Sequence, residues 1–327
     1  MSTHESFFAA SKVSLLLNPG SKIYIAGHKG LVGSAIWRNL VAKGFTNLLG
    51  WGSAELDLRD SESTMDAIVQ EKPDVVIMAA AKVGGIIANS TYPVEFLNEN
   101  IRIQTNVFEA AHAIKVPLLL FLGSSCIYPK FAEQPIKESS LLTGLLEESN
   151  NAYAIAKIAG VLQVQSYRKQ YGHRWISAMP TNLYGPYDNF DLTSSHVLPA
   201  LIRKFYEAKV AGLPSVTLWG SGRPLRDFLH VDDLADACLY LLETYNGNSP
   251  INVGWGQDIS IADLGALIAQ IVGYEGQIQW DTSMPDGTPR KLLDTSMINA
   301  LGWEPSISLR DGITTTYQWY LSKVTGI

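Results

Sequence analysis

Strand-like and helix-like segments alternate along the first 180 residues of the chain. Short β-branched and aromatic runs predict strands at residues 22–26, 47–51, 74–80, 118–123 and 175–179. Apolar residues at helical spacing predict helices at residues 31–43, 61–71, 95–114 and 152–171. Strands that alternate with helices of this length indicate βαβ units and a parallel sheet that is buried on both faces.

The second half of the chain has a different texture. After Pro180, clusters of Gly, Pro, Asn and Asp separate short apolar runs. A helix is predicted to resume near Phe228, to be capped by Asp232 or Asp233, and to end near Thr244. We therefore expect an α/β fold, a Rossmann-type doubly wound parallel sheet with a smaller C-terminal α/β substrate domain. The expected boundaries are a poorly ordered extension at 1–20, a nucleotide-binding domain at 21–185 to which 225–245 return, and a substrate domain formed by 186–224 and 246–327.

Composition excludes several classes of protein. Hydrophobic residues make up 46% of the 327 residues and charged residues 17%, which indicates a sizeable core and argues against disorder. The net charge of −6 removes the electrostatic reason to expect nucleic-acid or anionic-membrane partners. No apolar run approaches the ~18 residues that a membrane span needs. Two cysteines are too few for a disulfide framework, so a reducing, cytoplasmic location is expected. No metal ion is expected.

A glycine-rich loop follows the first predicted strand directly. Its spacing is Gly27-x-x-Gly30-x-x-Gly33, and a helix is predicted to begin within it. Strand, glycines and helix in this order allow the backbone to approach a pyrophosphate, and the helix N-terminus supplies amide donors to its charge. A glycine-rich turn without a ligand is the alternative, and the order of elements favours a dinucleotide cofactor.

The choice between NAD and NADP depends on the next strand. A carboxylate at its end would accept the ribose hydroxyls of NAD. The run 48–53 contains no carboxylate, and Lys29 in the loop offers a cation for the 2′-phosphate of NADP. The sequence therefore favours NADP. Asp57 is placed to contact the adenine edge, although an exposed carboxylate at the start of a helix is an equally good interpretation.

A Tyr–Lys pair opens the helix predicted at 152–171. Tyr153 and Lys157 are four residues apart, so they share one helix face. A cation beside the phenol would stabilise its phenolate form. Such a pair is usually structural, but Ser124 follows a buried strand and would lie at the sheet edge where such folds bind ligands. Together these three residues favour acid–base chemistry at the ligand-binding edge of the sheet.

Ser, Tyr and Lys after a GxxGxxG loop resemble the short-chain dehydrogenase/reductase superfamily in its extended form. An ordered set of longer strings is similar to the GDP-L-fucose synthases and extends from about residue 22 to about residue 322. These strings occupy residues 25–33, 79–85, 122–129, 153–160, 180–186, 188–190, 195–197, 219–222 and 285–291. The arginines that usually follow the second strand in bacterial members are replaced here by Trp51 and Ser53.

The resemblance implies an epimerase–reductase that acts on GDP-4-keto-6-deoxy-D-mannose, inverting carbons 3 and 5 before NADPH reduces carbon 4. By the family pattern, Ser124 and Tyr153 bind the keto oxygen and Tyr153 donates the final proton. Lys157 holds the nicotinamide ribose and lowers the Tyr153 pKa. Cys126 is the epimerisation base and His196 the acid. One oxygen-binding site would serve both steps, because enolate stabilisation and carbonyl polarisation need the same donors.

The resemblance also supplies a set of binding residues. Those expected at the cofactor are Gly27, His28, Lys29, Gly30, Leu31, Val32, Gly33, Asp57, Leu122, Gly123, Ser124, Ser125, Tyr153, Lys157, Pro180, Thr181, Asn182, Leu183 and His196. Those expected at the substrate are Lys204, Trp219, Arg226 and Asp286, with Arg226 and Lys204 on the diphosphate.

Several of these residues have plainer interpretations. A lone Cys after a buried strand is by default a small core residue, and a lone His in a loop is ordinary. The position of Cys126 near Ser124 favours the role of epimerisation base for Cys126. The surrounding Ser-His-Val-Leu-Pro string favours the role of acid for His196. Among the other histidines, His28 and His112 look structural, and His230 is expected to order the Asp232–Asp233 turn.

Similar enzymes pair through their two long helices, so a homodimer is expected. One rival interpretation is a sister enzyme of the GDP-colitose type, which would invert only carbon 5. The other is a non-catalytic NADP-binding sensor on the same fold. A sensor needs only the glycine loop, so the joint presence of Ser124, Tyr153, Lys157, Cys126 and His196 argues against it.

Overall fold

The computed structural model describes residues 17–284 and 286–326. Most of the expected N-terminal extension, residues 1–16, lies outside this range. Leu17 is buried in the main core, so the folded part of the chain begins before residue 21.

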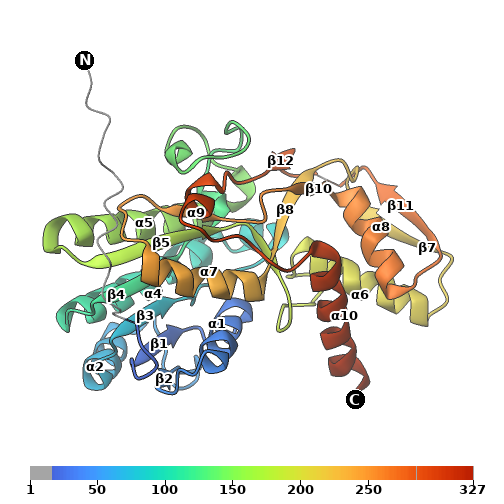
Figure 1. Cartoon of the computed structure of the whole chain (residues 1–327). Coiled ribbons are helices and arrows are strands. Elements are labelled where there is room, and N and C mark those ends of the chain that lie inside the picture. Colours follow the sequence, from blue (N-terminus) through green and yellow to red (C-terminus); the bar gives the residue numbers. More distant parts are fainter. Residues whose placement is uncertain (1–16, 285, 327) are drawn as a thin grey trace.

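A six-stranded parallel sheet forms the centre of the larger part of the molecule (Figure 1). Its strand order is β2-β1-β3-β4-β5-β9. The strands are β1 (Ile23–Ala26), β2 (Leu48–Leu49), β3 (Val75–Met78), β4 (Leu118–Leu122), β5 (Arg174–Pro180) and β9 (Ile251–Val253). The chain reverses its direction across the sheet between β1 and β3, and the carboxyl ends of the strands at such a point form the usual ligand crevice.

Strand residues alternate between two helical layers, as the period of two requires. Ile23, Ile77 and Leu120 face one hydrophobic cluster, and their neighbours Tyr24, Met78 and Phe121 face the other. The first layer contains α1 (Leu31–Ala42), α7 (Val231–Thr244) and α9 (Ser296–Ala300). The second contains α2 (Ser61–Glu71), α4 (Pro93–Ala113) and α5 (Asn151–Tyr171). The doubly wound parallel sheet predicted from the sequence is therefore confirmed.

The smaller part of the molecule has its own core. Phe205, Leu264 and Tyr317 belong to a third hydrophobic cluster. Its helices are α6 (Val197–Val210), α8 (Ile261–Val272) and α10 (Leu309–Thr325). One small sheet is formed by β6 (Asn182–Tyr184), β8 (Leu225–His230), β10 (Asp258–Ser260) and β12 (Arg290–Lys291), and a second by β7 (Ser215–Trp219) and β11 (Gln277–Asp281).

Four local details differ from the sequence analysis. The strand predicted at 47–51 is shorter, and α3 (Ile86–Thr91) was not predicted because its small and polar residues carry no clear helical period. The cap of α7 is His230 rather than Asp232 or Asp233, because the His230 Nδ1 accepts the amide of Asp232 at 3.2 Å. β9 lies in the central sheet, although its residues fall in the segment expected for the substrate domain. The division into domains otherwise stays a prediction.

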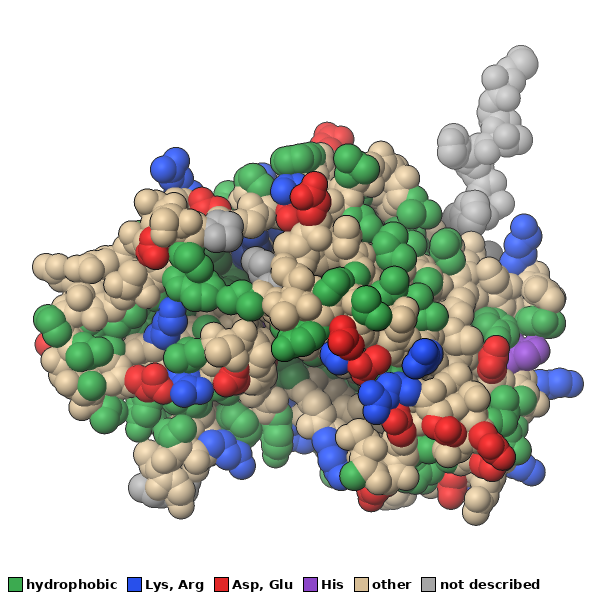
Figure 2. Space-filling model, turned by 180° about the vertical axis from the view of Figure 1, so that it is seen from behind, with side chains coloured by type: hydrophobic (Ala, Val, Ile, Leu, Met, Phe, Trp, Pro, Cys, Tyr) green, Lys and Arg blue, Asp and Glu red, His purple; other side chains and the backbone are tan. Residues whose placement is uncertain are grey.

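Surface charge is mixed on the face shown in Figure 2, where acidic and basic side chains lie side by side. Among the described residues, no helix is both long and apolar enough to cross a lipid bilayer.

Candidate active site

The glycine loop joins β1 to α1, and the start of α1 packs closely against the loop. Gly27 has a φ of +83°, and a Cβ on Gly33 would lie 2.1 Å from the Gly27 carbonyl oxygen. The helix therefore packs directly on the turn, as a pyrophosphate cradle requires. Gly30 caps α1 without any side-chain hydrogen bond, and the first turn of α1 contains no acidic residue. Its amides and dipole are thus available to an anion, and this geometry fits a dinucleotide.

Around this loop, His28 and Lys29 have different surroundings. His28 packs on Trp37 with ring centroids 5.4 Å apart, and burial lowers its pKa. Lys29 is exposed, and its ammonium lies 3.4 Å from the Glu55 carboxylate. Glu55 was not among the predicted site residues, although it lies about 20 residues past the glycines, where Rossmann folds carry an acidic residue. That spacing was the signal that could have found it.

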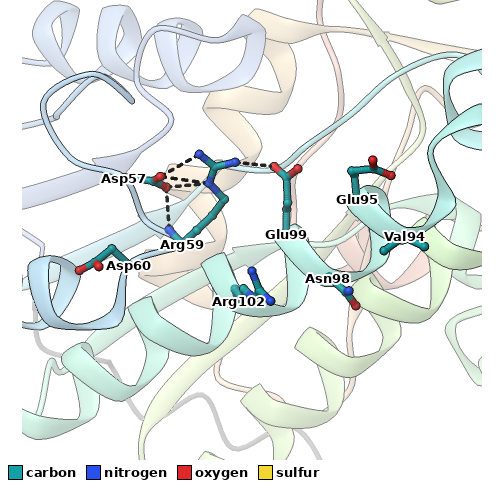
Figure 3. Close-up of a pocket in the computed structure, with 8 residues that line it drawn as sticks. All are labelled: Asp57, Arg59, Asp60, Val94, Glu95, Asn98, Glu99 and Arg102. Carbon is teal, nitrogen blue, oxygen red and sulfur yellow. Dashed lines mark hydrogen bonds and ion pairs between the residues drawn. The ribbon is translucent and has the colours of Figure 1, made fainter.

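Asp57 lies in a pocket of about 470 Å³ between the loop after β2 and α4. Its carboxylate is bound by the Arg59 guanidinium at 2.8–3.1 Å, and Arg59 also reaches Glu99 at 3.2 Å (Figure 3). The hydrogen bonds from Arg59 lower the Asp57 pKa to about 2. Asp57 is thus an ionised acceptor with a fixed orientation, and its contact with adenine stays a prediction.

The carboxyl end of β4 carries the predicted serine and cysteine. A short 3₁₀ turn (Ser125–Ile127) follows it, and the Ser124 hydroxyl accepts the Cys126 amide at 3.2 Å. The turn fixes the two side chains relative to each other at the sheet edge. Sequence position therefore placed this pair correctly.

Helix α5 brings the phenol and the ammonium against this edge. It approaches β4 closely because Gly160 packs on Phe121, where a Cβ would lie 2.3 Å from the Phe121 ring. The Lys157 ammonium donates to the Leu122 carbonyl at 2.8 Å and lies 5.9 Å from the centre of the Tyr153 ring. Burial lowers the Lys157 pKa to about 7.

The pKa of Tyr153 moves in the opposite direction to the one that the resemblance implied. Burial, followed by the negative charge of Cys126, raises the Tyr153 pKa, while the Ser124 hydroxyl opposes this rise. Lys157 is not among the groups that shift the Tyr153 pKa, and its ammonium donates to the Leu122 carbonyl. Tyr153 is consequently protonated at neutral pH, which is the form that a proton donor needs.

Cys126 is surrounded by donors. Its sulfur lies 3.4 Å from the Lys291 Nζ and 3.3 Å from the Asn150 Nδ2. Burial alone would raise the pKa of the thiol, but the Lys291 charge and hydrogen bonds from Ser124, Lys291 and Asn150 outweigh it and lower the pKa. A small pocket of about 30 Å³ lies beside the sulfur.

Lys291 and Asn150 were missed as site residues. Lys291 closes one of the strings that carried the resemblance, and Asn150 immediately precedes α5. Only the tertiary structure shows that they meet at Cys126, because Lys291 is 165 residues away along the chain.

His196 caps α6 and is solvent-accessible. The neighbouring Ser194 carbonyl accepts the Gly85 amide at 3.1 Å, which ties this loop to the segment after β3. Although part of the side chain stays exposed, the surrounding protein removes part of the hydration of the imidazole, and this effect, followed by the Lys291 charge, lowers the His196 pKa. The cation beside the Cys126 sulfur is therefore Lys291.

The predicted substrate residues are spread over the smaller part. Arg226 on β8 is half-buried, and its guanidinium donates to the Leu225 carbonyl at 2.8 Å. The Lys204 ammonium lies over the Trp219 ring, 5.4 Å from its centre. Asp286 accepts the Ser221 amide at 2.6 Å and the Ser221 hydroxyl at 2.7 Å, so it orders the turn after β7. Roles for these four residues at a ligand stay predictions.

The remaining cofactor candidates, residues 180–183, lie where β5 passes into β6. The side chains of Thr181 and Asn182 donate to the Asp227 carbonyl at 3.1 and 2.7 Å. These hydrogen bonds join the end of the central sheet to β8.

A Rossmann fold with a glycine cradle and a Ser–Tyr–Lys set at one sheet edge defines an extended short-chain dehydrogenase/reductase. Residues 23–254 match the model of the NAD dependent epimerase/dehydratase family. The chain belongs to this family and, within it, to the GDP-L-fucose synthases.

Individual relatives cover almost the entire chain. It is 57% identical to "GDP-L-fucose synthase 1" of Arabidopsis thaliana, over 96% of this chain and 97% of that protein. It is 52% identical to "GDP-L-fucose synthase" of Escherichia coli (strain K12), over 92% and 96%. It is 38% identical to "GDP-L-colitose synthase" of Yersinia pseudotuberculosis, over 92% and 98%.

Solved structures agree with this assignment. A GDP-6-OMe-4-keto-L-xylo-heptose reductase from C. jejuni is 37% identical with a TM-score of 0.90, covering 94% of this chain and 99% of that one. A GDP-L-fucose synthetase from Naegleria fowleri bound to NADP is 28% identical with a TM-score of 0.88, covering 94% and 96%.

Proposed function

We propose that this protein converts GDP-4-keto-6-deoxy-D-mannose to GDP-L-fucose, by inversion at carbons 3 and 5 and reduction at carbon 4. The observation that carries this proposal is the Cys126 thiol, held between Lys291 and Asn150 beside Ser124. A simple ketone reductase needs no base at this place. An epimerase does, because protons next to a ketone must be removed before the carbon can invert.

Epimerisation uses the ketone as an electron sink. Ser124 and Tyr153 hydrogen-bond the keto oxygen and stabilise the enolate, while the Cys126 thiolate removes a proton from carbon 3 or carbon 5. His196 returns a proton to the opposite face. Its lowered pKa makes it neutral in the free enzyme at neutral pH, and the diphosphate of a bound substrate adds negative charge that favours the protonated form.

Reduction uses the same oxygen site. NADPH, when bound, supplies a hydride for carbon 4. Tyr153 is protonated and donates its proton to the keto oxygen as the alcohol forms. The Lys157 ammonium and the Leu122 carbonyl are already hydrogen-bonded at 2.8 Å, so Lys157 is held in one orientation toward the cofactor ribose. Lys29 is the cation for the 2′-phosphate.

The sister reaction of the colitose type is supported less well. The chain is 57% identical to a plant GDP-L-fucose synthase and 38% identical to a GDP-L-colitose synthase over similar lengths. A sensor function is also disfavoured, because cofactor binding alone gives no reason for a thiol of lowered pKa at the sheet edge.

The proposal also includes pairing of two copies of the chain and a location in the cytoplasm. Ile155 and Leu162 on α5 are 46% and 41% exposed and lie on one helix face, and an apolar stripe of this kind suits pairing of two copies through their long helices. Both cysteines, Cys126 and Cys238, are thiols, which suits a reducing cytoplasm.

Product analysis tests the activity. The protein is incubated with GDP-4-keto-6-deoxy-D-mannose and NADPH in D₂O, and the sugar is identified by NMR. We expect GDP-L-fucose with deuterium at carbons 3 and 5. Deuterium at carbon 5 alone would favour the colitose-type reaction, and absence of both exchange and NADPH oxidation would contradict an enzymatic function.

A further inference from the structure

The adenosine end of the predicted cofactor site contains an acidic residue whose position conflicts with a simple NADP site. Glu55 lies in the loop after β2, with its side chain 59% exposed. It pairs with Lys29, and its carboxylate also accepts the Gly52 amide at 2.6 Å. The backbone hydrogen bond and the Lys29 charge lower the Glu55 pKa, so the carboxylate is ionised at neutral pH.

These contacts occupy the groups that a 2′-phosphate would use. In dinucleotide folds the ribose of adenosine sits between the glycine loop and the end of the second strand. Two groups there that could bind an anion, the Lys29 ammonium and the Gly52 amide, are bonded to Glu55. A Cβ on Gly52 would lie 2.8 Å from the Lys29 Nζ, so Lys29 lies directly against this loop.

Neighbouring residues do not replace Lys29. Trp51 packs on Tyr24 with ring centroids 4.9 Å apart, so it offers an aromatic surface and no charge. Arg59 is the next cation after Trp51 along the chain, and Asp57 and Glu99 bind it (Figure 3). The local charge near Lys29 is therefore balanced by Glu55 before any ligand arrives.

We propose that Glu55 is a specificity-determining residue that restrains the preference for NADPH and permits use of NADH, with its carboxylate accepting the ribose 2′-hydroxyl of NADH. A dianionic phosphate must approach Lys29 beside this carboxylate, and like charges at such a distance repel. A ribose hydroxyl meets the opposite situation, because an ionised carboxylate is a strong hydrogen-bond acceptor for it. This inference rests on the use of a nicotinamide cofactor in the proposed function.

The test replaces the charge while keeping the shape. Glu55→Gln should raise the ratio of kcat/KM for NADPH to that for NADH by about fivefold to tenfold, the scale of an exposed charge pair acting on a dianion. The gain should shrink at 0.5 M salt, because exposed charges are screened. Asp66→Asn removes one exposed negative charge from the adjacent helix α2 and should leave the ratio unchanged. Glu55→Ser serves as a second variant.

A binding measurement separates this inference from the reaction itself. Titration calorimetry with 2′,5′-ADP should show tighter binding to Glu55→Gln than to the parent protein, while 5′-AMP should bind no better. Lys29→Ala should remove most of the gain. Unchanged affinity of Glu55→Gln for 2′,5′-ADP would overturn the role of Glu55. Failure to turn over the GDP-sugar would count against the proposed function only, since the ADP titration needs no substrate.

Discussion

Replacing Lys291 by Met removes the positive charge beside the proposed base. The Lys291 Nζ lies 3.4 Å from the Cys126 sulfur, and its charge is the largest of the influences that lower the thiol pKa. A hydrogen bond to a charged group contributes about 1.5–3 kcal/mol, which corresponds to roughly 10- to 150-fold in an equilibrium. We therefore expect the thiolate fraction of Cys126 near neutral pH to fall by about that factor.

Alkylation by iodoacetamide measures this fraction directly. The only other cysteine, Cys238, is fully buried and its pKa is raised by burial, so the reaction reports Cys126. In Lys291→Met the pH profile of alkylation should move to higher pH, because removal of a nearby cation raises the pKa of a thiol. Deuterium exchange at carbons 3 and 5 should slow by the same 10- to 150-fold at neutral pH and recover as the pH rises.

A matched variant controls for contacts between Lys291 and the substrate. Lys291→Arg keeps the charge and should keep the alkylation profile of the parent protein close to its original pH range. Alkylation is measured on the free enzyme, so loss of a diphosphate contact does not affect it. A Lys291→Met protein with the parent profile would refute the assignment of Lys291 as the residue that activates Cys126.

Four further substitutions probe the site. Tyr153→Phe should slow reduction by about 10²–10⁴-fold, the scale of one general acid, with the melting temperature nearly unchanged; near-parent turnover would make Tyr153 structural. Cys126→Ala should stop deuterium exchange at carbons 3 and 5, while slow NADPH oxidation continues on the unepimerised sugar. His196→Asn should allow exchange to begin but impair inversion. If Cys126→Ala forms the L-sugar at the parent rate, the assignment of Cys126 as the base is wrong. Gly33→Ala places a Cβ 2.1 Å from the Gly27 carbonyl and should lower stability by about 1–3 kcal/mol in urea unfolding, with weaker 2′,5′-ADP binding; a stable protein with intact binding would contradict the tight cradle.

The parallel sheet and the glycine cradle could be predicted because both depend on local information. Period-two and helical spacing mark the elements, and a strand that leads directly into Gly27, Gly30 and Gly33 allows few other folds. Ser124, Tyr153 and Lys157 were likewise accessible, since two of them share a helix face and the third ends a strand of the same sheet. Short-range rules were sufficient for these features.

Electrostatic pairing was decided by tertiary structure. The resemblance implied Lys157 as the cation that tunes Tyr153, and it named no cation for Cys126. The fold directs Lys157 to the Leu122 carbonyl and brings Lys291 from a distant strand to the sulfur. It also folds Glu55 onto Lys29, which composition and strand endings did not reveal. A charge acts over a few ångströms of space, and neighbours at that distance can come from any part of the chain. The identity of the residues therefore determined which groups can titrate. Only the folded structure determined the direction in which their pKa values move.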